Sequence, residues 1–234
     1  MELSINKLEI TIIIPAYNEE KTIGSTLKSL KTLKEIDSIL VVDDGSTDKT
    51  SIVTKSLGVN LYKIESNQGK AYAMRKGFEL AKTPVIVFLD ADLGSSANEV
   101  IKLCRPVCYN KADVAIAVFN KSSIKGGFGL VRKLADWGLK ALTGRSIKAV
   151  LSGQRAFKRS ILSIEYFNYS GFGIEFGMTV DLLKTGARLL EIELDMEHRV
   201  TYRDFYGFLH RGKQFKDISK VIISKMIQKR FGLL

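Results

Sequence analysis

Cysteine, histidine, tryptophan and proline are scarce in this chain of 234 residues, which holds two, two, one and three of them. The two cysteines, Cys104 and Cys108, exclude a disulfide framework, and without a second pair of ligands they do not make a zinc site. Three prolines beside 19 glycines exclude collagen-like and proline-rich disordered chains. We therefore expect a globular protein that folds on its hydrophobic core alone.

Long apolar runs are absent as well. No segment approaches the roughly 18 to 20 consecutive apolar residues of a membrane-spanning helix. The first residues, MELSINKLEITIII, lack the basic stretch followed by a long apolar one that marks a signal peptide. We expect a cytoplasmic protein, with a peripheral position on the inner face of the membrane as the alternative.

Positive charge is in excess and is unevenly distributed. Lys and Arg number 36 against 25 Asp and Glu, a formal net charge of +11. Residues 111–160 carry 11 basic and 2 acidic side chains, and residues 199–234 carry 9 and 2. Such regions fit a phosphorylated partner, an anionic membrane face or simply a soluble basic surface. They lack interleaved aromatic readers, so we expect no nucleic acid partner.

Short apolar segments alternate with amphipathic ones along most of the chain. Buried strands separated by helices indicate an α/β fold, a Rossmann-like, mostly parallel sheet flanked by helices. We predict strands over 10–14, 38–43, 59–64, 84–89, 113–119, 151–157 and 187–196, a glycine-rich loop over 121–129, and helices over 19–33, up to 57, 71–81, 96–108, 130–142, 174–184 and 203–231.

The chain divides into one domain over residues 1–212 and a basic, amphipathic C-terminal helix over residues 213–234. This helical tail fits packing on the domain, a homodimer contact or an interfacial position on anionic lipid equally well. Trp137 has helical spacing with Leu134 and Leu142, which favours core packing over an apolar groove for an acceptor.

Polar clusters follow four successive predicted strands. Ligands of open parallel sheets bind beyond the carboxyl ends of the strands, so we expect these clusters to form one site. The chain lacks both G-x-G-x-x-G at its first strand–helix junction and G-x-x-x-x-G-K-[ST], which excludes a dinucleotide fingerprint and a P-loop. The clusters are Pro15-Ala16-Tyr17-Asn18-Glu19, Asp43-Asp44-Gly45-Ser46, Asn67-Gln68-Gly69-Lys70 and Asp90-Ala91-Asp92.

Asp90 and Asp92 stand two residues apart, so in an extended segment they point the same way. Two close carboxylates repel each other unless a cation joins them, and Mg²⁺ binds one or two carboxylates together with phosphate oxygens. We predict a divalent cation, Mg²⁺ or Mn²⁺, at this pair, with helix capping as the simpler alternative. His198, after the last predicted strand, is a candidate second ligand that Mn²⁺ tolerates.

Four strings between residues 11 and 93 resemble the GT-A glycosyltransferases of family 2 type: TIIIPAYNEEKTIGSTLKSL, ILVVDDGSTDKT, NQGKAYAMRKGFELA and VIVFLDADL. The resemblance implies a nucleoside-diphosphate sugar as donor and a D-x-D motif whose last aspartate, Asp92, binds the metal. The residues that it implies for the nucleotide sugar are Pro15, Ala16, Asn18, Glu19, Asp44, Lys70, Asp90 and Ala91.

The second half is most similar to glucosyl-3-phosphoglycerate synthases, on Gly126-Gly127, SGQRAFKR at 152–159, GFGIEFGMTVDLLKTG at 171–186 and EHR at 197–199. This similarity implies that His198 helps to hold the metal and that Glu175 contacts the sugar. We favour that role for Glu175 over a general base. Candidate acceptor-binding residues are Gly127, Arg132, Gln154 and Arg155.

The sequence therefore predicts a metal-dependent hexosyltransferase with Asp92 and Glu175 at the reaction centre. The donor is expected to be UDP-glucose or a similar sugar nucleotide, and the acceptor a phosphorylated, phosphoglycerate-like small molecule. Two alternatives stay open: a polyprenyl-phosphate glycosyltransferase at the membrane surface, because those enzymes share the first half, and a non-catalytic module that binds sugar nucleotides.

Overall fold

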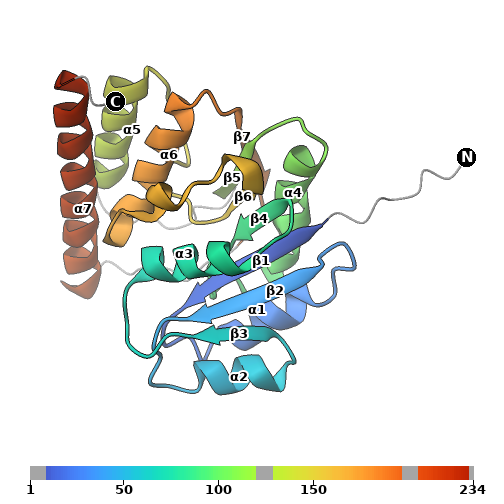
Figure 1. Cartoon of the computed structure of the whole chain (residues 1–234). Coiled ribbons are helices and arrows are strands. Elements are labelled where there is room, and N and C mark those ends of the chain that lie inside the picture. Colours follow the sequence, from blue (N-terminus) through green and yellow to red (C-terminus); the bar gives the residue numbers. More distant parts are fainter. Residues whose placement is uncertain (1–8, 120–128, 197–204, 232–234) are drawn as a thin grey trace, which may run out of the picture.

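Seven strands form one mixed sheet in a computed structural model of the chain, which describes residues 9–119, 129–196 and 205–231 (Figure 1). Their order is β3-β2-β1-β4-β6-β5-β7. β6 runs antiparallel to β4 and β5, and the other pairs are parallel, so the predicted mostly parallel sheet is confirmed. The strands are β1 (Ile10–Ala16), β2 (Ser38–Asp43), β3 (Asn60–Lys63), β4 (Val85–Phe88), β5 (Val114–Phe119), β6 (Arg155–Lys158) and β7 (Leu189–Leu194).

The helices lie close to their predicted positions. Short 3-10 helices between β6 and the next α-helix were not predicted, because their few residues carry no periodic pattern. The α-helices are α1 (Ile23–Leu30), α2 (Thr50–Ser56), α3 (Lys70–Leu80), α4 (Val100–Cys108), α5 (Leu130–Thr143), α6 (Ile174–Lys184) and α7 (Phe205–Arg230). The 3-10 helices are η1 (Gly94–Glu99), η2 (Arg159–Ile161), η3 (Ile164–Phe167) and η4 (Gly171–Gly173).

Each face of the sheet carries its own hydrophobic cluster. Within β1, Ile10, Ile12 and Ile14 join one cluster and Ile13 joins the other, because successive side chains of a strand point to opposite faces. α1 and α4 supply the helical side chains of the first cluster, and α3 and α6 those of the second. This coverage of both faces leaves the carboxyl edge of the parallel strands as the place for ligands.

A third cluster joins α5, α6 and α7, which lie side by side at one end of the molecule (Figure 1). α5 and α7 approach closely at Gly138, where an added Cβ would lie 2.4 Å from Cδ1 of Ile222. α7 is one helix from Phe205 to Arg230, and the division of the chain at residue 212 stays a prediction. Within the described part of the chain, none of the helices combines the length and apolarity needed to cross a membrane.

The predicted core position of Trp137 is wrong. Its side chain is 56% exposed, whereas Leu142 is buried. The two residues are five apart in the sequence, about 140° around an α-helix, so they do not share a face. The buried stripe of α5 runs through Ala135, Leu139 and Leu142 toward α6 and α7. Trp137 lies beside that stripe, on the outer face of the helix.

Asp113 joins the starts of β5 and β7 to the end of the antiparallel β6, at the edge of the sheet opposite the candidate site. Its Oδ2 accepts hydrogen bonds from the Nε (2.9 Å) and backbone N–H (3.0 Å) of Arg188, and its Oδ1 accepts one from the Nζ of Lys158. The hydrogen bonds from Arg188, followed by that from Lys158, hold the pKa of Asp113 well below its usual value, although burial opposes them. The carboxylate therefore stabilises the fold in its ionised form.

We expect Asp113→Asn to lower the free energy of unfolding at pH 7 by about 1 to 3 kcal/mol, because charged hydrogen bonds are lost. A carboxyl group whose pKa is lowered by folding stabilises the folded state fully at pH values above its unfolded pKa of about 3.9. This stabilisation is lost as the pH falls below that value. The difference between the two proteins should thus shrink progressively below about pH 4. Urea unfolding at pH 7 and pH 3 measures this difference in the free energy of unfolding. The control is Glu193→Gln, because Glu193 is exposed on β7. A difference that stays constant with pH would contradict the assignment.

Candidate active site

The loops after β1 and β2 are held together by hydrogen bonds at the carboxyl edge of the sheet. Asn18 has a φ of 56°, a left-handed conformation that asparagine tolerates. Its backbone N–H donates to Oγ of Ser46 (2.9 Å), and its Oδ1 accepts from the N–H of Thr47 (2.9 Å). The N–H of Glu19 donates to Oγ1 of Thr50 (2.8 Å). Asn18 and Glu19, two of the predicted nucleotide-binding residues, thus lie in a loop after β1 that hydrogen bonds hold in place.

Asp44 ties the end of β1 to the loop before α3. Its N–H donates to the carbonyl of Ala16 (2.8 Å), and its buried carboxylate accepts from the N–H groups of Gln68 (2.9 Å) and Gly69 (2.7 Å). These contacts position the start of α3, where Lys70 follows. Contact of Asp44 with a base, and of the half-buried Pro15 and buried Ala16 with a nucleotide, stays a prediction.

Lys70 connects three elements that are distant in the sequence. Its Nζ donates to Oδ1 of Asp90, beyond β4, and to Oε1 of Glu175, in the first turn of α6, both at 2.8 Å. Burial alone would lower the pKa of Lys70, but the charges and hydrogen bonds of the two carboxylates raise it overall. The ammonium group therefore keeps its proton and holds two carboxylates close together.

The antiparallel direction of β6 brings a second partner to Asp90. Phe88, at the end of β4, pairs with Arg155, at the start of β6, so the residues before β6 reach the carboxyl end of β4. Gln154, which is 1% exposed, donates from Nε2 to Oδ2 of Asp90 (2.6 Å). Both carboxylate oxygens of Asp90 thus accept hydrogen bonds from protein side chains. The sequence did not indicate this role for Gln154.

Gly153 lies against the pair formed by Lys70 and Asp90. A Cβ at this position would be 2.9 Å from Nζ of Lys70 and 2.9 Å from Oδ2 of Asp90, closer than carbon approaches such atoms. The position therefore requires glycine if that pair is to keep its geometry. The string SGQR contains this glycine, but nothing local in the sequence shows what faces it.

The guanidinium of Arg155 is surrounded by protein groups. It donates from Nε to the carbonyl of Ser152 (2.7 Å), from Nη1 to Oγ1 of Thr179 (2.8 Å) and from Nη2 to the carbonyl of Val150 (2.6 Å). Burial lowers the pKa of Arg155 to about 10, while Glu175 acts in the opposite direction. Arg155 thereby braces the segment before β6 against α6. Its predicted contact with an acceptor stays a prediction.

The predicted metal ligands are only partly within the described residues. Asp92 is half-buried and follows Ala91, whose carbonyl accepts from Oγ1 of Thr26 (2.9 Å). His198 and Gly127 lie outside the described residues, and Arg132 is exposed on α5. Among the side chains that the structure describes, those of residues 9–119, 129–196 and 212–231, no group of three or more His, Cys, Asp or Glu could hold a metal ion. The pairing of Asp92 with His198 stays a prediction.

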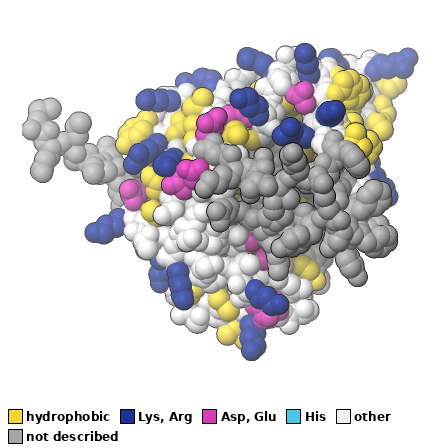
Figure 2. Space-filling view, turned by 180° about the vertical axis from the view of Figure 1, so that it is seen from behind, with side chains coloured by type: hydrophobic (Ala, Val, Ile, Leu, Met, Phe, Trp, Pro, Cys, Tyr) yellow, Lys and Arg dark blue, Asp and Glu magenta, His cyan; other side chains and the backbone are white. Residues whose placement is uncertain are grey.

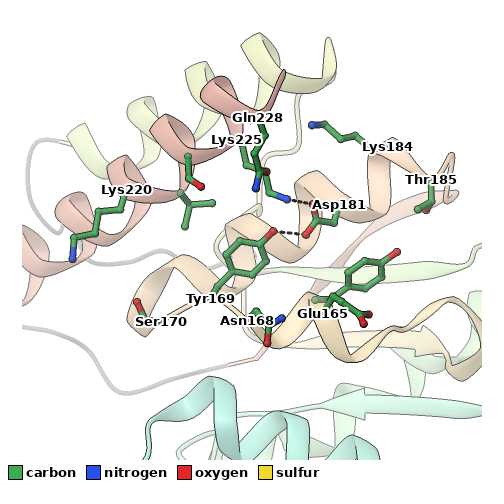
Figure 3. Close-up of a pocket in the computed structure, with 13 residues that line it drawn as sticks. Glu165, Asn168, Tyr169, Ser170, Asp181, Lys184, Thr185, Lys220, Lys225 and Gln228 are labelled. Carbon is green, nitrogen blue, oxygen red and sulfur yellow. Dashed lines mark hydrogen bonds and ion pairs between the residues drawn. The ribbon is translucent and has the colours of Figure 1, made fainter. Parts of the chain in front are cut away.

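A separate pocket of about 630 Å³ lies between η3, α6 and α7 (Figure 3). Asp181 of α6 accepts hydrogen bonds there from Tyr169 and from Lys225 of α7, and the Nζ of Lys225 is 5.4 Å from the centre of the Tyr169 ring. Burial, followed by the hydrogen bond to Asp181, raises the pKa of Tyr169. This network fastens α7 to α6. The sequence showed no role for Asp181, because its partners are distant along the chain.

Helices on both faces of the sheet, a D-x-D sequence after β4 and polar loops gathered at the carboxyl edge are the features of a GT-A fold. The model of the family described as glycosyl transferase family 2 matches residues 11–163. The chain belongs to this family, and the resemblance found in its sequence is confirmed.

Similar proteins differ in what they act on. An uncharacterised protein of Methanocaldococcus jannaschii is 38% identical over 162 residues, 65% of this chain and 66% of that protein. The UDP-N-acetylglucosamine–dolichyl-phosphate N-acetylglucosaminyltransferase of Methanococcus voltae is 29% identical over 182 residues, 66% and 71% of the two chains. The structure of glucosyl-3-phosphoglycerate synthase from Mycobacterium tuberculosis with Mn²⁺, UDP-glucose and phosphoglyceric acid matches with a TM-score of 0.75 at 25% identity, over 93% of this chain and 79% of that one.

We expect Gly153→Ala to lower glycosyltransferase activity about 100-fold, because an added methyl group displaces Lys70 and Asp90, and a shift of about 1 Å at reacting groups costs that much. Activity is measured with the donor that the wild-type protein uses, and thermal unfolding verifies that the variant is folded. Gly212→Ala is the matched control, since no atom lies within 4 Å of its added Cβ. Full activity of a folded Gly153→Ala variant would show that this contact is dispensable.

Proposed function

We propose that the chain is a metal-dependent hexosyltransferase that moves a sugar from a nucleoside-diphosphate sugar to a phosphorylated acceptor. The observation that carries this proposal is the group formed by Lys70, Asp90 and Glu175 beyond the ends of the strands. It supplies charged acceptors and a cation of fixed position, and it includes Asp90, the first aspartate of the D-x-D sequence. The solved synthase with UDP-glucose and Mn²⁺ supports UDP-glucose, or a similar UDP-sugar, as the donor.

The base and ribose of the donor would lie at the loops after β1 and β2. We assign them to Pro15, Ala16, Asn18, Glu19 and Asp44. Support comes from the hydrogen bonds that tie these loops to each other and to the start of α3. Loops fixed before binding lose little conformational freedom when the nucleotide arrives. We also assign Ala91 to the donor site, because it lies between Asp90 and Asp92.

The residues present suit a divalent cation. Because Asp90 accepts from Lys70 and Gln154, we assign the metal to Asp92 and His198, with the donor diphosphate as a further oxygen ligand. A carboxylate and phosphate oxygens are the ligands that Mg²⁺ and Mn²⁺ prefer, and Mn²⁺ also accepts imidazole. When bound, the ion would supply positive charge beside the departing diphosphate.

Glu175 and Asp90 would orient the transferred sugar. The ammonium of Lys70 fixes both carboxylates, and each would accept sugar hydroxyl groups through the lone pairs that its protein hydrogen bonds leave over. In the transfer, an acceptor oxygen bonds to the anomeric carbon, and the bond from this carbon to the diphosphate oxygen breaks with its electron pair. An ionised phosphate oxygen needs no base for this step, whereas a hydroxyl group must lose its proton.

The acceptor phosphate would meet the basic region of residues 111–160. We assign Arg132, Gly127 and Gln154 to acceptor binding and treat Arg155 as a positioning residue for that segment, because its described contacts are to protein groups. A phosphoglycerate-like acceptor is supported by the ligand of the solved synthase. Polyprenyl phosphate at the inner face of the membrane is the second candidate, supported by the relative named for dolichyl phosphate.

Asp92→Asn should abolish the dependence of donor binding on the metal. In the wild type we expect Mn²⁺ or Mg²⁺ to strengthen binding of the correct nucleotide sugar by about tenfold or more, because the ion neutralises the diphosphate. Calorimetric titration with UDP-, GDP- and dTDP-sugars measures this. Asp136→Asn, an exposed aspartate of α5, should behave as the wild type. Equal metal dependence in Asp92→Asn would refute the assignment, and binding without turnover would indicate a non-catalytic module.

The two acceptor classes are separated by parallel assays with 3-phosphoglycerate and with polyprenyl phosphate in detergent. We expect turnover with one of them and none with its counterpart lacking phosphate, glycerate or polyprenol. Arg132→Ala should raise the KM of that acceptor about tenfold and leave the KM of the donor unchanged, because one charged contact to phosphate is lost. Turnover of the uncharged counterpart would contradict the role of the phosphate.

A further inference from the structure

Large apolar side chains are exposed on the outer sides of α5 and α7. Trp137 of α5 is 56% exposed, and Ile223 and Ile227 of α7 are 57% and 51% exposed. Side chains of this size are normally buried, and a group of them on one surface marks an interaction site. Leu130, Phe215 and Phe231 are further exposed apolar side chains of these two helices and of the residue that follows α7.

These side chains belong to one surface. Gly138 and Ile222 mark the contact between the two helices, and the residues next to them in the sequence, Trp137 and Ile223, are both exposed. Ile223 and Ile227 are four residues apart, so they lie on the same side of α7. The half-buried Leu134 and Met226 pack against the cluster beneath. We call the outer surface formed by Leu130, Trp137, Phe215, Ile223 and Ile227 the α5–α7 face.

Basic side chains accompany the apolar ones on these helices. Lys and Arg side chains and hydrophobic ones lie side by side in the upper right part of Figure 2, above the grey residues. Asp136 is exposed on α5, and Asp217 of α7 is half-buried and accepts from the N–H of Phe172. The exposed basic residues are Arg132, Lys133, Lys140, Lys213, Lys216, Lys220, Lys229 and Arg230.

The orientation of α7 is fixed, so its exposed stripe cannot turn inward. Lys225, which is 9% exposed, donates to Asp181 of α6 (Figure 3). Val221 packs onto Gly173 so closely that an added Cβ would be 2.7 Å from its Cγ2. Rotation of the helix would break this ion pair and expose the buried Ile218 and Ile222. The apolar exposure is therefore a lasting feature of the fold.

We propose that the α5–α7 face docks the protein on an anionic lipid membrane. Exposed aliphatic and tryptophan side chains among lysines and arginines are the composition that inserts at the boundary of headgroups and acyl chains. Basic side chains at the edge are attracted to anionic headgroups, and their long stems keep the charge in water. A protein partner fits less well, because lysine is depleted at protein interfaces.

The biological purpose of the docking rests on the proposed function, because a polyprenyl phosphate acceptor lies in such a membrane. The docking itself does not depend on that function. Lipid binding itself is measured without sugar transfer. The full chain is mixed with vesicles of phosphatidylcholine, with and without phosphatidylglycerol, and floated on a density gradient. We expect flotation only with phosphatidylglycerol, weakening as salt screens the charges. Trp137 is the one tryptophan of the chain, so its emission should shift to the blue and be quenched by brominated lipid.

Substitutions test the surface itself. Ile223→Asp together with Ile227→Asp should weaken vesicle binding about tenfold or more, because charges replace the inserting side chains. Ile52→Asp is the matched control, since Ile52 is 65% exposed on α2 and lies outside the α5–α7 face. It should bind vesicles as the wild type does. Thermal unfolding verifies that each variant is folded.

Three results would overturn the docking proposal: no blue shift with anionic vesicles, equal loss of vesicle binding in the Ile52→Asp control, or a dimeric mass together with Trp137 emission that is already blue-shifted without vesicles. Failure of the proposed function looks different. In that case the wild-type protein floats with anionic vesicles but transfers no sugar to either acceptor. Conversely, if docking alone fails, transfer to a soluble acceptor continues while vesicle binding is absent.

Discussion

The ammonium group of Lys70 holds the candidate active site together. It contacts carboxylates at residues 90 and 175, which come from the end of β4 and the start of α6. Without this cation, the buried carboxylate of Glu175 and the partly exposed carboxylate of Asp90 would face each other and repel. The absence of a side chain at Gly153 is a condition of the same contact, because a methyl group there would meet both Lys70 and Asp90.

The single reversal of strand direction explains how the second half of the chain reaches this site. Were β6 parallel to β4, its polar start would lie at the opposite edge of the sheet. Because it is antiparallel, Arg155 pairs with Phe88, and Gln154 reaches Asp90. The same segment is braced on α6 through Thr179, whose hydroxyl in turn donates to the carbonyl of Glu175 (2.7 Å). The direction of β6 and the hydrogen bonds through Thr179 thus both help to position the carboxylates of Asp90 and Glu175.

Local sequence patterns predicted the helices and strands, but they did not predict contacts between residues that are distant along the chain. The ranges of β2 and α6 agree with the sequence analysis, because apolar periodicity and flanking turn residues lie within each segment. The clusters after β1, β2 and β4 could be expected to meet, since parallel strands share one edge. The roles of Gly153 and Asp181 could not, because their partners are in other elements. The core position predicted for Trp137 was wrong because Trp137 and Leu142 are five residues apart, which places them on different faces of an α-helix.

The excess positive charge serves separate purposes in the fold. Lys158 and Arg188 bind Asp113, Lys225 binds Asp181, and Arg155 donates to groups inside the protein. These cations are held by protein groups, although the side chain of Arg188 is still 53% exposed. The exposed basic residues of α5 and α7 are different, because few acidic side chains accompany them. A phosphate-bearing partner approaching the molecule would therefore be drawn to the side formed by α5 and α7, so one charged surface can serve both acceptor recognition and membrane contact.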